Sequence, residues 1–350
     1  MRPWPRFANS FTELPNGVIV FAAYGSHAQG FQLWRTDGTE AGTRLVKQLG
    51  SGLLGSNPSW LTTIPALGGA LFTATTDAGR ELMFTDGTAA GTRLFRDLIP
   101  AGSMPALGAT AVDGAALYFS ADSAGSGREP YRLANGRVQR LLDATPGAYG
   151  SNPQGFEPLF DGQQSFVLFS AWDANGREPW VHSVAGTRIL ANIARNASGS
   201  WPREFTRVGD TVFFTAEGTN LGRELWSTNG KSATLVRDIQ SGASRGSDPH
   251  GLISFRGRLF FTAASPTHGV ELFRSDGTTA GTVRVADIHA GPASSGPAGI
   301  VSYGDRLYFS ATDGSSGTEL WSSDGTAADT HRVTDLHAGS GDSTPSQLTV

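Results

Sequence analysis

One short pattern recurs seven times along the chain, and its spacing constrains the fold more than any other feature. Clear copies read Glu-Leu-Met-Phe-Thr-Asp-Gly-Thr from Glu81 and Glu-Leu-Trp-Ser-Ser-Asp-Gly-Thr from Glu319. Self-similarity at a period near fifty residues is typical of solenoids, propellers and arrays. The first residue of the pattern falls at seven positions separated by 46 to 49 residues: Gln32, Glu81, Glu129, Glu178, Glu224, Glu271 and Glu319.

Each repeat contains four short runs that suit β-strands. In the repeat at 247–291 these runs are 251–255, 258–263, 270–275 and 283–288, which we name strands A to D. They are rich in β-branched and aromatic residues, and no window shows helical periodicity. Radial repetition of four antiparallel strands is the build of a propeller blade. We therefore predict an all-β fold, a seven-bladed β-propeller of four-stranded antiparallel blades, with residues 1–350 as a single domain.

A second marker, Ser-x-Pro, precedes strand A of each repeat. It falls at Ser56, Ser103, Ser151, Ser200, Ser247, Ser295 and Ser343. Strand A itself appears eight times, because residues 4–11 and 343–350 both resemble it. We expect the blade holding residues 18–21 to take its A strand from one terminus, with 4–11 as first choice and the other terminus packed beside it. Residues 343–350 are then either a surplus edge strand or the start of a further repeat.

Composition excludes several classes of partner. The formal charge is -4 and no run of Lys and Arg exceeds two residues, so we expect no nucleic acid ligand. The chain has no Cys, which excludes disulfides, thiolate catalysis and Cys-based zinc sites. No apolar run approaches the ~18 residues of a membrane span. Residues 1–7 lack the apolar core of a signal peptide. We expect a monomer without cofactors.

The repeats also resemble a known family. The turn between strands C and D reads Thr-Asn-Gly in the fifth repeat, and it is shortened in the third and fourth. It reads Asp-Gly-Thr intact at Asp37, Asp86, Asp276 and Asp324. This pattern resembles the ELWxxDGT repeat proteins of bacterial surfaces and secretions, and the match covers nearly the whole chain. The resemblance implies a β-propeller outside the cytoplasm, with its leader absent from this chain, and it implies no catalytic residues.

Residues that recur in every repeat are most simply parts of the scaffold. The repeated Glu lies on strand C, where a buried carboxylate needs hydrogen bonds. Its expected partners are backbone amides of the next blade or the Arg that precedes it in four repeats. The aromatic residue two positions later is expected to pack between blades. The Asp after strand D is expected to hold the turn that leads to Ser-x-Pro.

Solitary residues are better candidates for function. In a four-stranded blade the B–C and D–A connections lie on one side, which we name the recognition face. Loops on a rigid scaffold commonly carry recognition, and exposed aromatic residues are typical anchors. The alternative for Trp201 is that it packs against its own blade. The ligand-binding candidates on this face are Tyr149, Trp172, Trp201, His268, His289 and His337.

No motif with established chemistry emerges from the sequence. His289 and His337 occupy matched positions one blade apart, but the other blades add Gln240 and no further His, so we expect no metal site. The loops 122–127 and 173–176 suit turns better than calcium. Residues 311–321 are similar to the tryptophan-docking motif of quinoprotein dehydrogenases, with Ser316 in place of Thr. That motif is structural, so the similarity supports only the propeller.

These patterns favour a non-enzymatic recognition or surface-interaction module that binds a protein or a glycan. The first alternative is a propeller enzyme, a hydrolase or lyase, with a site on the axis. The second is a structural spacer within a larger surface protein. A deep pocket of Arg, His and carboxylates favours the enzyme, shallow aromatic grooves favour binding, and a featureless polar face favours the spacer.

Overall fold

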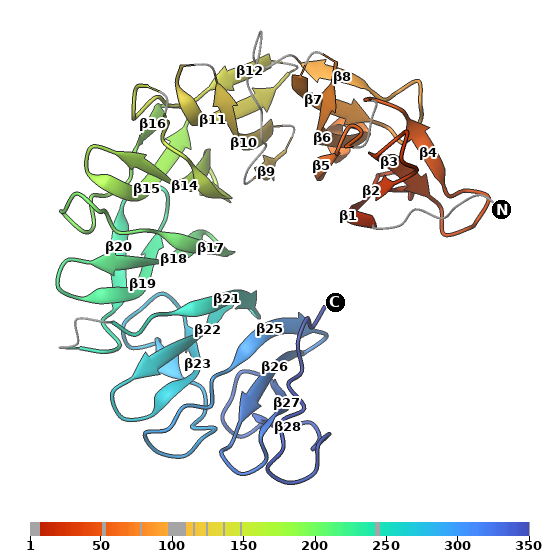
Figure 1. Cartoon of the computed structure of the whole chain (residues 1–350). Coiled ribbons are helices and arrows are strands. Elements are labelled where there is room, and N and C mark those ends of the chain that lie inside the picture. Colours follow the sequence, from red (N-terminus) through yellow and green to blue (C-terminus); the bar gives the residue numbers. More distant parts are fainter. Residues whose placement is uncertain are drawn as a thin grey trace. The chain divides into compact units, whose positions relative to one another are not determined.

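The chain forms seven small sheets. The structure, a computed structural model, describes residues 8–50, 54–77, 79–96, 110–114, 116–123, 125–135, 137–147, 149–241 and 246–349. These residues build seven four-stranded antiparallel sheets, each from four consecutive strands (Figure 1). The fold is thus the predicted all-β, seven-bladed β-propeller, and we number its blades one to seven in chain order. In the described ranges, the one helical element is a 3-10 turn, η1 (Pro65–Leu67).

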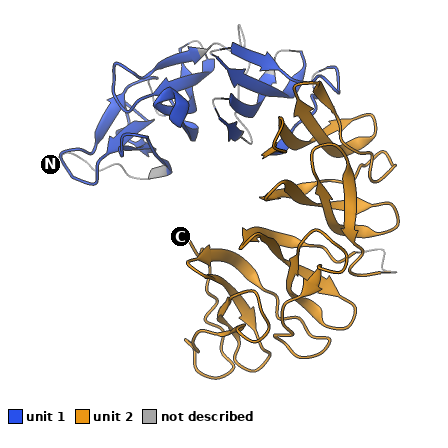
Figure 2. Ribbon diagram, turned by 180° about the vertical axis from the view of Figure 1, so that it is seen from behind, with its two compact units in different colours: residues 1–156 blue, residues 157–350 orange. Residues whose placement is uncertain are grey.

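Two compact units divide the chain, residues 1–156 and residues 157–350 (Figure 2). The first unit contains blades one to three. Blade one consists of β1 (Ala8–Glu13), β2 (Ile19–Tyr24), β3 (Phe31–Thr36) and β4 (Arg44–Lys47). Blade two consists of β5 (Ser59–Ile64), β6 (Gly69–Thr76), β7 (Gly79–Thr85) and β8 (Arg93–Arg96). Blade three consists of β9 (Thr110–Asp113), β10 (Ala116–Ser123), β11 (Gly127–Ala134) and β12 (Arg137–Arg140).

The second unit contains blades five to seven and all of blade four except the first residues of its first strand. Blade four consists of β13 (Gln154–Phe160), β14 (Ser165–Asp173), β15 (Gly176–Ser183) and β16 (Gly186–Ile189). Blade five consists of β17 (Arg203–Val208), β18 (Thr211–Gly218), β19 (Gly222–Thr228) and β20 (Ala233–Arg237). Blade six consists of β21 (His250–Phe255), β22 (Arg258–Ser265), β23 (Gly269–Ser275) and β24 (Val283–Arg284). Blade seven consists of β25 (Ala298–Tyr303), β26 (Arg306–Thr312), β27 (Thr318–Ser323) and β28 (His331–Arg332).

Blade six shows how closely the strands follow the sequence pattern. Strands A, B and C begin at or within one residue of the predicted positions, whereas strand D ends at Arg284 instead of the predicted 288. The Val285 amide still donates to the Leu272 carbonyl at 2.8 Å. The Ile288 amide donates instead to the carboxylate of Glu271 at 3.2 Å. Strand D is shorter than predicted because, at Ile288, the Glu271 side chain replaces the backbone of strand C as the hydrogen-bond acceptor.

Blade one takes its A strand from the N-terminal segment, as predicted. Strand β1 pairs with β2 through Thr12 opposite Val20 and Glu13 opposite Ile19. Residues 4–7 of the predicted segment lie outside the described residues, and the strand continues two residues past the predicted end. Of the C-terminal copy, residues 343–349 belong to no strand. The predicted placement of this copy beside blade one stays a prediction.

Within each unit, the core lies between successive blades. Each B strand of blades two to seven contributes one fully buried phenylalanine: Phe72, Phe119, Phe169, Phe214, Phe261 and Phe309. Between blades five and six, Phe213 packs in one cluster with Phe261 and Phe273. Trp321 of blade seven packs in the same way against residues of blade six. In these blades the repeated aromatic residue of strand C packs between blades, as predicted.

In blade one and in blades three to seven, the repeated Glu position of strand C makes a hydrogen-bonded contact that we name the clasp. Glu271 is fully buried, and its carboxylate accepts bonds from the Ser295 amide at 3.1 Å and the Ser295 hydroxyl at 2.6 Å. The preceding Arg is not a clasp partner, since Arg177 donates to the Ser170 hydroxyl at 2.9 Å. Thus the structural role of the repeated Glu is confirmed, with backbone amides and a serine hydroxyl as its partners. The other clasps pair Gln32 with Ser56, Glu129 with Ser151, Glu178 with Ser200, Glu224 with Ser247, and Glu319 with Ser343.

Candidate functional site

Two tryptophans meet on the recognition face of the second unit. Trp172 lies near the end of β14 in blade four, and Trp201 lies in the D–A connection between β16 and β17. Their ring centroids are 5.1 Å apart and the planes are inclined by 87°. This edge-to-face geometry is favourable for aromatic pairs. Two of the six candidate residues therefore come together, and we name them the Trp172–Trp201 pair.

A buried cation supports the pair. The guanidinium of Arg177 lies 5.7 Å from the centroid of each ring. Only 3% of Arg177 is exposed, and burial lowers its pKa to about 10, so it stays protonated at neutral pH. A desolvated cation over an aromatic face is attracted by about 2 kcal/mol. Arg177 therefore holds both rings in place from the inner side.

The backbone fixes Trp201 as firmly as the side chains do. The carbonyl of Arg177 accepts bonds from the amides of Ser200 at 2.9 Å and Trp201 at 3.1 Å. A parallel bridge joins Arg177 to Gly199. A Cβ atom on Gly199 would lie 2.2 Å from the Arg177 nitrogen, so this close approach requires glycine. The local sequence Gly-Ser-Trp-Pro thereby presents the indole on a rigid turn.

The backbone conformation of Trp201 is unfavourable for its residue type. Its φ is 48°, in the left-handed region. Glycine adopts this region without cost and Asn or Asp tolerate it, whereas a bulky residue there is uncommon. The middle residue of Ser-x-Pro has this conformation in every described copy: Asn57, Asn152, Trp201, Asp248, Gly296 and Thr344. The fold alone would be served better by Gly or Asn, so the scaffold does not account for the tryptophan.

The alternative that Trp201 packs against its own blade does not describe its aromatic and cationic contacts. It lies directly before β17 of blade five, yet its aromatic and cationic contacts are with Trp172 and Arg177 of blade four. Even so, 41% of Trp201 remains exposed. The exposed part is the part of the ring that neither neighbour covers.

A polar pocket of about 620 Å³ opens beside this pair on the same face. Blades five and six both line it, and we name it the Arg223 pocket. The pocket contains two arginines, two carboxylates and one amide, whereas Val270 and two glycines add little bulk. Its polar lining residues are Arg203, Glu217, Arg223, Gln240 and Asp248.

Arg223 links the pocket to the tryptophans. Its guanidinium donates to the Trp201 carbonyl at 3.0 Å and to Glu217 at 3.2 Å, and it lies 3.8 Å from Asp248. Arg223 is 5% exposed. Burial and the nearby Arg203 lower the pKa of Arg223, while the two carboxylates act in the opposite direction. The four charges of the pocket balance, because two arginines face two carboxylates.

The other four candidate residues have separate contacts. Tyr149 is 94% exposed and belongs to the first unit. His268 contacts the neighbouring Thr267 hydroxyl at 2.7 Å. His289 and His337 each lie 3.3 Å from a carbonyl of their own D–A connection. These two histidines therefore brace turns. Over the described ranges, no three His, Asp or Glu side chains gather as a metal site.

The acidic loops serve as turns, in line with the sequence interpretation. Asp122 forms an ion pair with Arg128 at 2.8 Å, and Asp173 accepts the Asn175 amide at 2.7 Å. In the segment similar to the docking motif, hydrogen bonds from Ser315 and Ser316 outweigh burial and lower the pKa of Asp313 to about 2. These carboxylates are engaged within their own loops.

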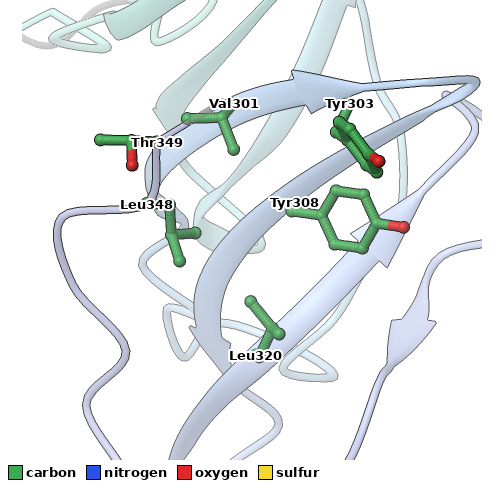
Figure 3. Close-up of a pocket in the computed structure, with 6 residues that line it drawn as sticks. All are labelled: Val301, Tyr303, Tyr308, Leu320, Leu348 and Thr349. Carbon is green, nitrogen blue, oxygen red and sulfur yellow. The ribbon is translucent and has the colours of Figure 1, made fainter. Parts of the chain in front are cut away.

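A second pocket lies against blade seven and belongs to the scaffold. It measures about 470 Å³ and is lined by Val301, Tyr303, Tyr308, Leu320, Leu348 and Thr349 (Figure 3). The matching residues of blade six are Ile253, Phe255, Phe260 and Leu272, and these pack against blade seven. The apolar lining is therefore the blade-packing surface that every repeat needs. Leu348 covers it from the position that Ile300 occupies one repeat earlier.

The Arg223 pocket was not among the sequence candidates. Its Arg and Glu lie within repeated positions, which favoured a structural interpretation. One signal was present in the sequence. Arg precedes the repeated Glu at four positions, whereas the other repeats carry Phe31, Val270 and Thr318 there. A residue present in only some repeats is less constrained by the scaffold, and Arg177 and Arg223 are two such residues.

Comparison with known proteins gives only distant likenesses. No family model and no curated protein matches the chain. The β-propeller domain of the Trilobed protease from Pyrococcus furiosus is similar at 9% identity and a TM-score of 0.44, over 95% of this chain and 99% of that domain. TolB from Acinetobacter baumannii is similar at 12% identity and a TM-score of 0.38, over 75% of this chain and 62% of that one. A Mycobacterium tuberculosis puromycin-hydrolyzing peptidase is similar at 11% identity and a TM-score of 0.44, over 92% of this chain and 52% of that one. The fold assignment stands on the sheets themselves. In the described part, no helix has the length and apolar character needed to cross a membrane.

Proposed function

We propose that this chain is a non-enzymatic recognition module of the ELWxxDGT repeat family, that it works outside the cytoplasm, and that it binds a protein or a glycan through the recognition face. The observation that carries the proposal is Trp201. The residue is 41% exposed on a turn fixed by Arg177, in a backbone conformation that tryptophan rarely adopts. Strained residues that the surrounding structure holds in place cluster at functional sites.

Rigid, partly exposed tryptophans are effective binding anchors. They offer a large contact area and lose little conformational freedom on binding. Trp201 is held by a backbone bond, an aromatic partner and a cation, so this freedom is already restricted before a ligand arrives. A structural spacer gains nothing from this arrangement, and the spacer interpretation is correspondingly weaker.

The titratable groups favour binding over catalysis. A general acid working near neutral pH needs a raised pKa. Burial raises the pKa of the Glu129, Glu178, Glu224 and Glu271 carboxyls, all of which hold clasps, and of Glu157. In the Arg223 pocket, the side chains of Glu217 and Asp248 are 52% and 72% exposed and lie beside Arg223. The carboxyls with raised pKa are therefore mainly the ones that the scaffold uses.

The test compares Trp201→Ala with a matched control, Trp60→Ala. Trp60 is 51% exposed and has a φ of 58°, so it matches Trp201 in exposure and backbone conformation but lies in blade two. Immobilised wild type and both variants are exposed to a glycan array and to cell-envelope protein from the native source. We expect a ligand that wild type and Trp60→Ala retain and Trp201→Ala loses. Equal retention by all three would contradict a role for this face.

A further inference from the structure

The backbone of Trp201 connects the Trp172–Trp201 pair to the Arg223 pocket. Trp201 provides the ring, and its carbonyl accepts the bond from Arg223 at 3.0 Å. Arg203, two residues further along the chain, lines the pocket. A ligand in the pocket therefore lies beside the backbone of Trp201, and a ligand longer than the pocket extends from there toward the indole. The ligand must suit both an aromatic surface and a charged, hydrogen-bonding cavity.

The charge balance of the pocket narrows the chemistry of that ligand. A phosphate or sulfate site concentrates positive charge. Here the charges of Arg203 and Arg223 are offset by Glu217 and Asp248, and Gln240 adds both a donor and an acceptor. An anionic ligand would be repelled at close range by Glu217 and Asp248, and a cationic ligand by Arg203 and Arg223. The lining instead suits neutral groups that donate and accept together, which is the property of hydroxyl groups.

The indole adds a second condition. Trp201 is 41% exposed, with Trp172 in edge-to-face contact with its ring and the polar Arg223 pocket beside its backbone. A protein hot spot is usually surrounded by contacts that exclude water. A pyranose ring fits these surroundings better, because its C–H face packs on an aromatic ring while its rim of hydroxyls points to polar groups. Vicinal hydroxyls also match the paired donors of a guanidinium.

We propose that the recognition face binds a neutral oligosaccharide, with one sugar ring hydrogen-bonded in the Arg223 pocket and the adjoining ring stacked on Trp201. The inference rests on the proposed recognition function and names its ligand class. Glu217 and Asp248 accept hydrogen bonds from the sugar hydroxyls, Arg203 and Gln240 donate hydrogen bonds to them, and Arg177 keeps the indole in place. The site takes at least two sugar units, because one unit occupies the Arg223 pocket and a second one stacks on the ring of Trp201 beside it.

The experiment measures binding by calorimetry with four probes: cellohexaose, mannohexaose, chitohexaose and the acidic hexagalacturonate. The proteins are the full chain, Trp201→Ala, Trp201→Phe, Glu217→Gln and the control Trp60→Ala, each checked by thermal melting. We expect at least one neutral hexaose to bind. Trp201→Ala should weaken that binding at least about tenfold, as loss of an anchor does. Trp201→Phe should weaken it less, and Trp60→Ala should leave it unchanged.

The outcomes separate this inference from the proposed function. Binding of hexagalacturonate alone, or of no probe at all, would overturn the neutral-glycan inference. If Trp201→Ala then still lost a protein ligand, the recognition function would stand with a different ligand class. If a neutral hexaose bound wild type and Trp201→Ala equally, the site would be misplaced and the inference would fail. A loss of neutral-hexaose binding in Trp201→Ala and Glu217→Gln, but not in Trp60→Ala, supports both the inference and the proposed function.

Discussion

Blades six and seven contain the same clasp in different surroundings. Glu271 accepts bonds from the amides of Ile288 and Ser295 at 3.2 and 3.1 Å, and from the Ser295 hydroxyl at 2.6 Å. Glu319 accepts the matching bonds at 3.1, 3.1 and 2.6 Å. Yet burial raises the pKa of Glu271, whereas the bond from Ser343 lowers that of Glu319. Identical local geometry therefore has opposite electrostatic consequences.

The difference arises from the neighbour of each blade. Blade seven packs on blade six through a shared cluster that includes Phe309 and Trp321. The clasp of Glu319 instead involves Ser343, which lies in the segment 343–349 that forms no strand. Both carboxylates are inaccessible to solvent, but Glu271 is also covered by the strands of blade seven, and the resulting desolvation disfavours the charged form. The repeat therefore specifies the hydrogen bonds of the clasp, and the neighbouring blade determines how much free energy the ionisation of its carboxyl group costs.

The largest expected effect is the loss of an inner clasp. Glu271→Ala leaves two buried amides and one hydroxyl without their acceptor, which typically costs about 1–3 kcal/mol of unfolding free energy. Urea unfolding followed by circular dichroism measures it. Glu271→Gln is the control, because Gln32 closes the clasp of blade one with its amide oxygen, 2.8 Å from the Ser56 hydroxyl. Glu319→Ala should lower the melting temperature less than Glu271→Ala, and an equal loss would contradict the comparison.

The pH dependence of the two clasps should have opposite signs. The folded pKa of Glu271 is raised, so the stability it contributes is present below its unfolded pKa and is lost as pH rises through the folded value. The folded pKa of Glu319 is lowered, so its contribution is present above the unfolded pKa and is lost as pH falls through the folded value. The two carboxyls therefore favour the folded state on opposite sides of their unfolded pKa.

Glutamine variants at the two positions measure these signs directly. Unfolding free energies of wild type, Glu271→Gln and Glu319→Gln are compared between pH 3 and pH 8. The advantage of wild type over Glu271→Gln should shrink as pH rises, while its advantage over Glu319→Gln should grow as pH rises and then level off. Parallel curves for both variants would show that the neighbouring blade has no influence.

The smallest expected effect comes from shortening the C-terminal segment. Deleting residues 346–350 keeps Ser343 and hence the clasp, and it removes Leu348 from the pocket that Val301 and Leu320 also line. Partial exposure of these side chains should lower stability by less than about 1 kcal/mol. Thermal melting measures it. Deleting 343–350 should cost more, because it also opens the clasp, and equal losses would show that Ser343 adds nothing.

The sequence predicts the scaffold well and the site only in part. The period of Glu81 and Glu319 indicates the blades, because each blade must solve the same packing problem. Trp172 and Trp201 are recognisable as solitary residues on one face. Their contact is not, since it depends on how blades four and five meet. Arg223 could not be separated from the repeat by pattern alone, because its role depends on Asp248, a residue of the following D–A connection.

The left-handed residue of Ser-x-Pro has a consequence for how such a protein evolves. The conformation recurs with φ between 42° and 56° in six copies that carry five different residue types. The turn is thus held by its serine, its proline and the adjacent carbonyl, and it tolerates almost any side chain at a moderate energetic cost. New specificity can therefore arise by exchanging one residue in one copy. Gene duplication would supply further positions for such changes while the scaffold stays the same.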